Sequence, residues 1–578
     1  MYRRSLKTSQ LDLFSSVDTL LKGKALKVYT DAEKWHNQFR IQVTSRIDED
    51  IFRPLFDEYH GAPNASIRVL TAMMILKEAR GWSDAQLFEE CIFNILVRSA
   101  LGLMNMDDAV PVKSTYYLLR NRIVKHEEET CENLIEKVFA QVSKSQAIEF
   151  KINGAKIRMD SKLLGSNIAW YSRYELIHET VRQAYLRAKS RIDSLLSEDE
   201  ISLLGRIAGE TGDKVSYRST GSEIETKLSQ LGIVIYKIIN GIDDDSSASL
   251  ETLRRVFNDQ YEVVNNAVNT RPKQEISAAS VQSPHDTECQ YRQKDDQQVK
   301  GYAVNVTETC DSGDSFNLVT NVLVDTAGAV DCDFLQTAIE ETKEIVTGKI
   351  ETANADGAYH SPENQDYCEE NEIDLIVGAI QGKPSRYDLS IDETGDLVVT
   401  DLKTNTEIAP RKVESRKEDG ESKWAILNDR NQYRYFTQKD IDACILRKQV
   451  AARTQEELNR RNNVEATIFQ LGFHYPNAKS RYRGLIKHKM WASCRCFWIN
   501  FVRIANFVAG SSPNYALKSV NRRIFPHLCA QNEKIWQTLP CLLHFLTKWS
   551  EDIALFFGLN QFAPIFFGKS AEMMIFKK

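Results

Sequence analysis

The chain has 578 residues, of which 42% are apolar and 27% charged, and its formal net charge is −6. This length predicts several domains with sizeable cores. The slightly acidic balance gives no overall signal for nucleic acid, so any DNA-binding surface must come from a local cluster of basic residues.

Residues 1–150 are predicted to form an all-helical N-terminal domain. Apolar residues recur at helical spacing from Ala65 to Arg80, Gly81 is a suitable helix end, and Ser83 is a suitable cap for a second helix that extends to Phe93. A third helix begins at residue 114. Basic residues in or just before it could contact DNA, as recognition helices do: Lys113, Arg120, Arg122 and Lys125. A plain bundle for self-association fits the same pattern.

The first candidate metal ligand is Asp160. The segment from Ala155 to Met159 alternates apolar and charged residues, and the pattern breaks at Gly165. We therefore expect a strand that presents Asp160 at its C-terminal end. Residues 167–282 are then predicted to be a charged, helical insertion for bracing or dimer contacts, with breaks between helices at 211–222 and 241–249.

The second candidate ligand is Asp356. Two strands with strong alternation, residues 300–310 and 316–328, are separated by a turn. A helix over 333–346, a strand that stops before Asp356, a helix capped by Ser361 and a strand over 373–377 follow. Asp356 is thus expected at a strand-to-helix crossing, where open α/β sheets place ligand-binding groups.

A second insertion, residues 383–454, is predicted to be polar and β-rich. Its segment DETGDLVVTDLKTNTEIA, residues 392–409, is typical of a hairpin. Four basic residues after the hairpin could contact DNA, although a charge run is usually only a solvated face: Arg411, Lys412, Arg416 and Lys417.

The third candidate ligand is Glu465. Asn462 or Asn463 is expected to cap a helix whose first turn contains Glu465, where the helix dipole favours negative charge. The expected apolar face of this helix comprises Val464, Ile468, Phe469 and Leu471. Other acids compete for the third position, but helix capping or a solvated face explains them as well: Glu351, Glu363, Glu456 and Glu457. A single acid of this kind is usually structural, and only the combination of the three indicates a site.

The clearest basic segment is residues 477–525, which contains ten Lys or Arg and no Asp or Glu. A helix over 485–508 is predicted, with five large side chains in the core: Met490, Trp491, Phe497, Trp498 and Phe501. Its basic residues are expected to face DNA phosphates, and the alternative is a solvated face.

These segments resemble the DDE-type insertion-sequence transposases, in particular the branch with a long helical N-terminal domain. The resemblance extends from about Val28 to Ile504. It is carried by these motifs: Asp160-Ser161, VKGYAVNVTET at 299–309, Asp356 to Tyr359, Arg461 four residues before Glu465, and YRGLIK at 482–487. Two positions depart from it, since Leu458 stands where related groups carry Tyr and Gly472 where they carry Lys.

The resemblance implies an α/β fold: an RNase H-like mixed sheet flanked by helices, made of residues 151–166, 283–382 and 455–510. It also implies that Asp160 bridges two Mg²⁺ or Mn²⁺ ions, while Asp356 holds one and Glu465 the other. Such an ion pair can clamp the attacking and leaving oxygens of a phosphoryl transfer, and hard oxygen ligands suit these metals. No covalent protein intermediate is needed.

The implied partners are double-stranded DNA, as terminal inverted repeats and target, and a second copy of the chain in a homodimer. The DNA-binding residues we predict are Arg461, Arg481, Tyr482, Arg483, Lys487, Lys489, Lys113, Arg120, Arg122, Arg292 and Lys300. A metal-dependent nuclease without strand transfer, and a DNA-binding protein whose catalytic site has lapsed, are the alternatives.

The expected location is the bacterial cytoplasm. The eleven cysteines include no CxxC pair, which favours a reducing compartment, and the segment MYRRSLKTSQ has no apolar signal region. No stretch reaches the roughly 18 apolar residues of a membrane span. The sequence indicates no role for the tail, residues 511–578.

Overall fold

The computed structural model describes residues 1–5, 10–12, 14–242, 247–294, 297–378, 385–392, 396–413, 423–474 and 478–510. Residues Met1–Phe507 belong to one compact unit. The tail 511–578 and the predicted DNA contacts Arg416 and Lys417 lie outside the described residues. Within the described ranges, no helix is long and apolar enough to cross a membrane.

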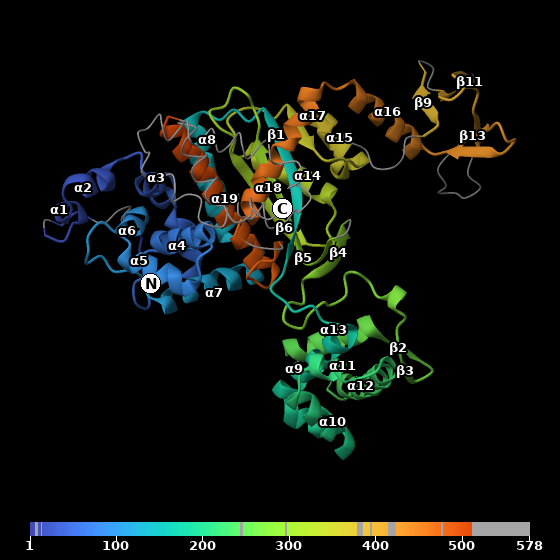
Figure 1. Cartoon of the computed structure of the whole chain (residues 1–578), viewed down its shortest axis with the longest axis horizontal. Helices are drawn as coiled ribbons and strands as arrows, with labels where there is room; N and C mark the ends of the chain where they lie inside the picture. The colour runs from blue at the N-terminus through green and yellow to red at the C-terminus, as the bar shows by residue number, and fades with distance from the viewer. Residues whose placement is uncertain are drawn as a thin grey trace, which may run out of the picture. The chain divides into compact units, whose positions relative to one another are not determined.

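A mixed, six-stranded sheet is the largest sheet in the described part of the chain (Figure 1). Its strands are β1 (Lys156–Gly165), β4 (Gln290–Lys294), β5 (Gln297–Thr309), β6 (Val319–Thr326), β7 (Thr352–Ala355) and β8 (Asp374–Val377). β5 pairs antiparallel with β1, β4 and β6, whereas β1, β7 and β8 pair parallel. The order β6-β5-β1-β7-β8 follows, in which β5 runs against the other four strands. The predicted mixed α/β fold is confirmed, although β4 was not predicted.

β1 is longer than predicted, and this changes the place of Asp160. The strand was expected to end at Asp160, but it continues to Gly165 because β5 pairs with it from Ile157 to Gly165. Asp160 therefore lies in mid-strand, opposite Val306. The far end of this pairing needs a glycine, since a Cβ on Gly301 would lie 2.1 Å from the carbonyl oxygen of Leu164.

Strand alternation assigns the side chains of β1 to two faces. Ile157 and Met159 belong to the core with α14 (Leu335–Lys343) and α15 (Pro362–Glu370). Leu164 belongs to the core with α19, and by the same alternation Asp160 lies on this second face. The helices over the second face are α17 (Gln455–Asn462), α18 (Val464–Gly472) and α19 (Leu485–Val508).

Local signals set the ends of these helices. Ser361 caps α15 by accepting a hydrogen bond from the Asn364 backbone, and Pro362 is the first helical residue, as predicted. Thr454 and Glu457 form a capping box at the start of α17. α19 has the predicted bounds and buries four of the five predicted side chains, while Trp498 is partly buried against Phe39 and Phe501.

The N-terminal region is helical, as predicted. Its elements are α1 (Val17–Leu20), α2 (Gly23–Thr30), α3 (Trp35–Gln42), η1 (Thr44–Arg46), η2 (Glu49–Leu55), α4 (Ile67–Arg80), α5 (Asp84–Phe93), α6 (Ile95–Leu101), α7 (Lys113–Thr130) and α8 (Leu134–Phe150). Gly81 ends α4 in the left-handed conformation, and Ser83 caps α5. α4, α7 and α8 share one hydrophobic core with α19 and with one face of β5 and β6.

The first insertion has a hydrophobic core of its own. Its helices are α9 (Arg173–Asp193), α10 (Glu198–Gly209), α11 (Gly212–Tyr217), α12 (Gly221–Gly241) and α13 (Ala248–Gln260). The predicted break at 211–222 is wrong in part, since α11 lies within it, and residues 243–246 of the other break lie outside the described residues. A short hairpin follows, β2 (Tyr261–Val264) and β3 (Ala267–Thr270), turning at Asn265 and Asn266.

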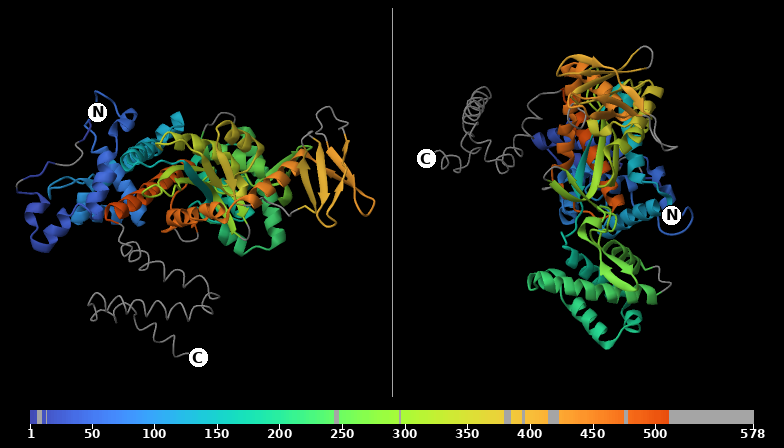
Figure 2. Two further views of the ribbon diagram at one scale, coloured as in Figure 1. Left: turned by 90° about the horizontal axis from the view of Figure 1, so that it is seen from above. Right: turned by 90° about the vertical axis from the view of Figure 1, so that its right-hand side faces the viewer.

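The second insertion is β-rich, as predicted, and its strands lie together in Figure 2. They are β9 (Tyr387–Ile391), β10 (Leu397–Asp401), β11 (Thr406–Ile408), β12 (Arg411–Val413), β13 (Lys423–Leu427) and β14 (Tyr433–Phe436), followed by α16 (Gln438–Ala452). The predicted hairpin over 392–409 is present as the antiparallel pair β10 and β11. Arg411 and Lys412 are exposed on β12.

Candidate active site

Asp160 and Asp356 converge on one arginine, although they are 196 positions apart in the sequence. The Oδ2 atoms of Asp160 and Asp356 lie 3.7 Å and 3.3 Å from the same nitrogen, Nη2 of Arg461. Asp160 comes from the middle of β1, Asp356 directly follows the parallel neighbour β7, and Arg461 lies in the last turn of α17. The sheet thus brings the first two predicted metal ligands together under α17.

Backbone hydrogen bonds fix both carboxylates. Oδ1 of Asp160 accepts from the Ser161 N–H at 2.9 Å, and Oδ1 of Asp356 accepts from the Gly357 N–H at 2.6 Å. The side chains are 15% and 34% exposed. Each carboxylate therefore keeps its Oδ2 atom turned toward the shared guanidinium and open in part to solvent.

The charges of this cluster do not balance. When both carboxylates are ionised, one guanidinium leaves one negative charge in surplus. Burial raises the pKa of the Asp160 carboxyl above its ordinary value, Arg461 opposes the rise, and the neighbouring Asp356 adds to it. Nε of Arg461 is itself buried without a hydrogen-bond partner in the described structure. The cluster is therefore suited to a further cation.

Glu465 lies in the first turn of α18, as predicted, but Asn463 at the N-cap position makes no side-chain capping hydrogen bond, so the predicted cap is not formed there. It is exposed, and one helical turn separates it from Arg461 along the chain. Among the described residues, no group of three or more His, Cys, Asp or Glu side chains is placed to hold a metal ion. The structure thus pairs Asp160 with Asp356 and does not add Glu465 to the pair.

The competing acids have other partners or sit at helix starts. Glu456 pairs with Arg460 at 3.5 Å, and Glu457 caps α17 through Thr454. Glu363 lies in the first turn of α15. The predicted apolar face of α18 is wrong at Phe469, which is 51% exposed, because the helix turns that position away from the face of Val464 and Leu471.

The donors of the cluster fit a divalent metal. Carboxylate oxygens are hard ligands that suit Mg²⁺ and Mn²⁺. A cationic guanidinium already stands between the two carboxylates, with one nitrogen facing both. Asp160 and Asp356 are the residues that would hold the ion.

A second carboxylate–arginine cluster, which shares only strand β1 with the first, was not predicted. Glu308 on β5 is fully buried and accepts from Arg158 at 2.6 Å and from Thr467 of α18 at 2.8 Å. Nη1 of Arg503, on α19, lies 2.7 Å from Oε2 of Glu308, the oxygen that also accepts from Thr467. Arg158 and Glu308 stand opposite each other on β1 and β5, which a correct strand register would have indicated.

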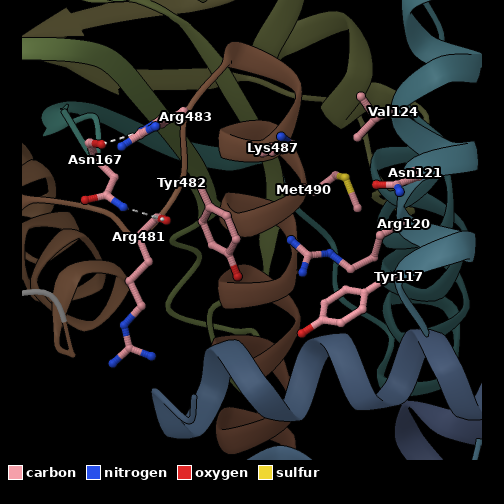
Figure 3. Close-up of a pocket in the computed structure, with 10 residues that line it drawn as sticks. All are labelled: Tyr117, Arg120, Asn121, Val124, Asn167, Arg481, Tyr482, Arg483, Lys487 and Met490. Carbon is pink, nitrogen blue, oxygen red and sulfur yellow. Dashed lines mark hydrogen bonds between the residues drawn. The ribbon is translucent and has the colours of Figure 1, made fainter. Parts of the chain in front are cut away.

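Five of the predicted DNA-binding residues line one cavity of about 340 Å³, the basic pocket (Figure 3). Its full lining is Tyr117, Arg120, Asn121, Val124, Asn167, Arg481, Tyr482, Arg483, Lys487 and Met490, with four cations and no carboxylate. Figure 3 shows α7 on one side and the loop before α19 on the other. The pocket therefore presents a basic lining, contributed in part by the N-terminal helices.

Within the basic pocket, the cations differ in how they are held. Arg481 donates to the Trp82 carbonyl at 3.0 Å, and Arg483 donates to the Asn167 carbonyl at 2.7 Å. Both are exposed, as is Lys487. The Tyr482 hydroxyl is hydrogen-bonded to Glu78 and Lys77, and its ring lies between Lys77 and Arg120. Tyr482 therefore fastens the loop to the N-terminal helices, and the three cations form the accessible surface.

The remaining predicted DNA-binding residues contact protein groups. Lys489 pairs with Glu127 at 3.1 Å, Arg292 donates to the Ala329 carbonyl at 2.6 Å, and Lys300 donates to the Tyr171 carbonyl at 3.4 Å. On the N-terminal helices, Lys113 and Arg122 lie over the rings of Phe88 and Phe56. Their predicted contacts with DNA stay predictions.

The expectation that the basic residues of α19 face outward is wrong for two of them. Arg495 is buried and donates to the Leu471 and Glu78 carbonyls, at 2.9 and 2.8 Å. Arg503 is held by Glu308 and Thr467. α19 is a packed core helix, and its accessible cation in the basic pocket is Lys487 near its first turn.

The N-terminal region also matches a known family. Residues 28–122, which extend from α2 into α7, match the family model described as "Transposase domain (DUF772)". The match supports a transposase. No curated protein and no solved structure matches the chain. The matched residues include Lys113, Arg120 and Arg122 of α7, so a transposase domain contributes Arg120 to the basic pocket.

Proposed function

We propose that the protein is a DDE-type transposase, which binds the terminal inverted repeats of its own element, cleaves DNA strands with the help of divalent metal ions, and joins them to target DNA. The observation that carries the proposal is the convergence of Asp160 and Asp356 on Arg461 in a chain with a transposase domain. A negative pair of carboxylates with a surplus charge is what metal-assisted phosphoryl transfer requires.

The strand order supports an RNase H-like core for this site. In the order β6-β5-β1-β7-β8, β5 alone runs against the others, and the two acids lie on β1 and directly after its parallel neighbour β7. Parallel neighbours with the acids on one face give a rigid base, so the carboxylates hold their places without a loop having to order first.

Each residue of the site has a role in the proposal. Asp160 and Asp356 hold Mg²⁺, and Glu465 completes the set from the first turn of α18. The ions, when bound, polarise the scissile phosphate and lower the pKa of the attacking water or 3′-hydroxyl. Arg461 partly offsets the charge of the two aspartates in the absence of the ions, and it then becomes available to a phosphate oxygen of the DNA.

The basic pocket is the proposed DNA-binding surface. Arg481, Arg483 and Lys487 are accessible there, and no carboxylate opposes them in the pocket lining. Cations of this kind bind backbone phosphates, fix the register of the protein on the duplex, and give a binding constant that falls with salt. Two element ends have to be brought together, so we propose a homodimer.

One observation favours a second candidate, a DNA-binding protein with a lapsed catalytic site. The described residues contain no three-acid group placed to hold a metal. If Glu465 does not approach the aspartates when DNA is bound, the protein would bind element ends and not cut them.

The test is to incubate the purified protein with the DNA flanking its own gene, with Mg²⁺ or with chelator, and to map breaks to the nucleotide. Mg²⁺-dependent breaks at two inverted repeats, joined to target DNA in the same reaction, support the transposase. Breaks without joining support a nuclease. Tight, salt-sensitive binding without breaks supports the lapsed site.

A further inference from the structure

Lys162 is a cation on β1 that the proposed site does not use. It follows Asp160 by two residues, so strand alternation places both side chains on the same face of the sheet, about 6 to 7 Å apart along the strand. The side chain is partly buried. Among the residues that the structure describes, it has no carboxylate or hydrogen-bond partner, whereas partly buried ammonium groups usually have one.

The ammonium group lies against the end of α18. A Cβ built on Gly472 would be 3.2 Å from Nζ of Lys162 and 3.9 Å from its Cε. Gly472 is the last residue of the helix whose first turn contains Glu465. Lys162 therefore fills the space that a side chain at position 472 would otherwise occupy.

The space beside the end of α18 is thus occupied by a lysine from β1. The helix end alone does not account for the lysine, because the carbonyls at a helix C-terminus attract a cation only weakly. An anion from outside the chain would complete the environment of Lys162.

We propose that Lys162 binds a DNA backbone phosphate beside the scissile one and so positions the scissile phosphate over Asp160 and Asp356. The inference rests on the proposed function and adds a substrate-binding residue to it. The ligand is a phosphodiester of the element end, because Lys162 and Asp160 lie on the same face of β1 and one DNA strand can present neighbouring phosphates to both positions.

The experiment moves the ammonium group from position 162 on β1 to position 472 at the end of α18. Four proteins are compared on a duplex of the mapped element end: wild type, Lys162→Met, Gly472→Lys, and the double variant. Lys349→Met is the matched control, since Lys349 pairs with Glu372 on the surface. Two quantities are measured, the single-turnover cleavage rate with Mg²⁺ and the slope of log binding constant against log salt with Ca²⁺ in place of Mg²⁺.

Lys162→Met is expected to slow cleavage about 10- to 100-fold, as for loss of one hydrogen bond to a charged group, and to reduce the salt slope by about 1. The double variant, Lys162→Met with Gly472→Lys, is expected to recover most of the cleavage rate and most of the salt slope, because the new ammonium group reaches the same space. Gly472→Lys alone slows cleavage, because two ammonium groups compete there. Lys349→Met matches wild type in both measurements.

Several results would overturn the inference. One is that Lys162→Met keeps the wild-type cleavage rate and the wild-type salt slope. Another is that the double variant unfolds at the normal temperature and is still as impaired as Lys162→Met. If Lys162 only braces α18, Lys162→Met lowers the melting temperature and leaves the salt slope unchanged. If wild type binds the ends and never cuts, the proposed function fails, and the salt slopes still decide whether Lys162 binds phosphate.

Discussion

Two carboxylate–arginine clusters share strand β1 and differ in the sign of their net charge. Glu308 is one carboxylate with two arginines, Arg158 and Arg503, and it is fully buried. Asp160 and Asp356 are two carboxylates with one arginine, Arg461, and both are partly exposed. The first cluster has one positive charge in surplus and satisfies both oxygens of its carboxylate within the protein, whereas the second has one negative charge in surplus.

We propose that this difference separates a structural cluster from the metal-binding one. A buried carboxylate is tolerated when cations and a hydroxyl satisfy its oxygens, as Arg158, Arg503 and Thr467 do for Glu308. Two like charges that share one cation remain suited to an added metal ion. A surplus of negative charge and exposure, more than the presence of acids, indicate which cluster carries the chemistry.

The largest effect on stability is expected at the buried Glu308 cluster. Glu308→Gln should lower the free energy of unfolding by about 3 to 5 kcal/mol, because the buried Arg158 and the partly buried Arg503 lose their counter-ion. Urea unfolding followed by circular dichroism measures this. Asp160→Asn is the matched control and should change stability by less than about 1 kcal/mol, since it removes a repelling charge. Equal losses in the two variants would remove the distinction.

The cluster of Asp160, Asp356 and Arg461 is expected to be stabilised by a divalent metal ion. Mn²⁺ or Mg²⁺ at about 100 times its dissociation constant should stabilise wild type by about 2.7 kcal/mol. Asp160→Asn and Asp356→Asn should lose most of this gain, because each removes a ligand. Thermal unfolding with and without metal is the measurement. A conservative variant outside the cluster, Lys349→Gln, should keep the full gain, and metal stabilisation that persists in both aspartate variants would contradict the site.

The two clusters should also respond to pH with opposite sign in the metal-free protein. Burial would raise the pKa of Glu308, but Arg503 and Arg158 outweigh it and lower the pKa below the ordinary 4.5, so its contribution to stability is present above that value and lost as the pH falls. Burial and Asp356 raise the pKa of Asp160 above 3.8, so its contribution is present at low pH and lost as the pH rises.

Unfolding of wild type and the two variants over a series of pH values tests these signs. The deficit of Glu308→Gln should shrink on acidification below about pH 4.5. The advantage of Asp160→Asn over wild type should grow as the pH rises above about 4. If stability changes with pH in parallel for the three proteins, folding neither lowers the pKa of Glu308 nor raises the pKa of Asp160.

The smallest expected effect is at the basic pocket. Arg483→Gln and Lys487→Gln should each reduce the salt slope of DNA binding by about 1, with weaker binding to all sequences alike. Titrations at four salt concentrations by fluorescence anisotropy measure this. Lys349→Gln should leave the slope unchanged, and an unchanged slope in both pocket variants would place the DNA elsewhere.

Local signals in the sequence predicted the parts of the fold that depend on neighbours in the chain. The cap at Ser361 with Pro362, the helix over 485–508 and the hairpin over 392–409 are all present. The hairpin at Asn265 and Asn266 was missed, although two Asn between β-branched residues are a usable signal, since both adopt positive φ.

Contacts between distant segments were beyond such reasoning. Asp160 lies in mid-strand because β5, more than 130 residues further along, pairs across it. Arg503 was expected to face DNA, but it packs against Glu308 on a strand 195 positions away. The sequence suggested that Asp160 and Asp356 belong together, and only the parallel pairing of β1 and β7 shows how they meet.

The most direct test of the account compares wild type with Asp356→Asn on both mapped element ends, with Mg²⁺, in one assay that measures binding and strand cleavage. The account predicts that wild type binds and cuts at both repeats, and that Asp356→Asn binds the ends nearly as tightly and does not cut. Cleavage by Asp356→Asn would contradict the assignment of the aspartate pair as the metal-binding centre.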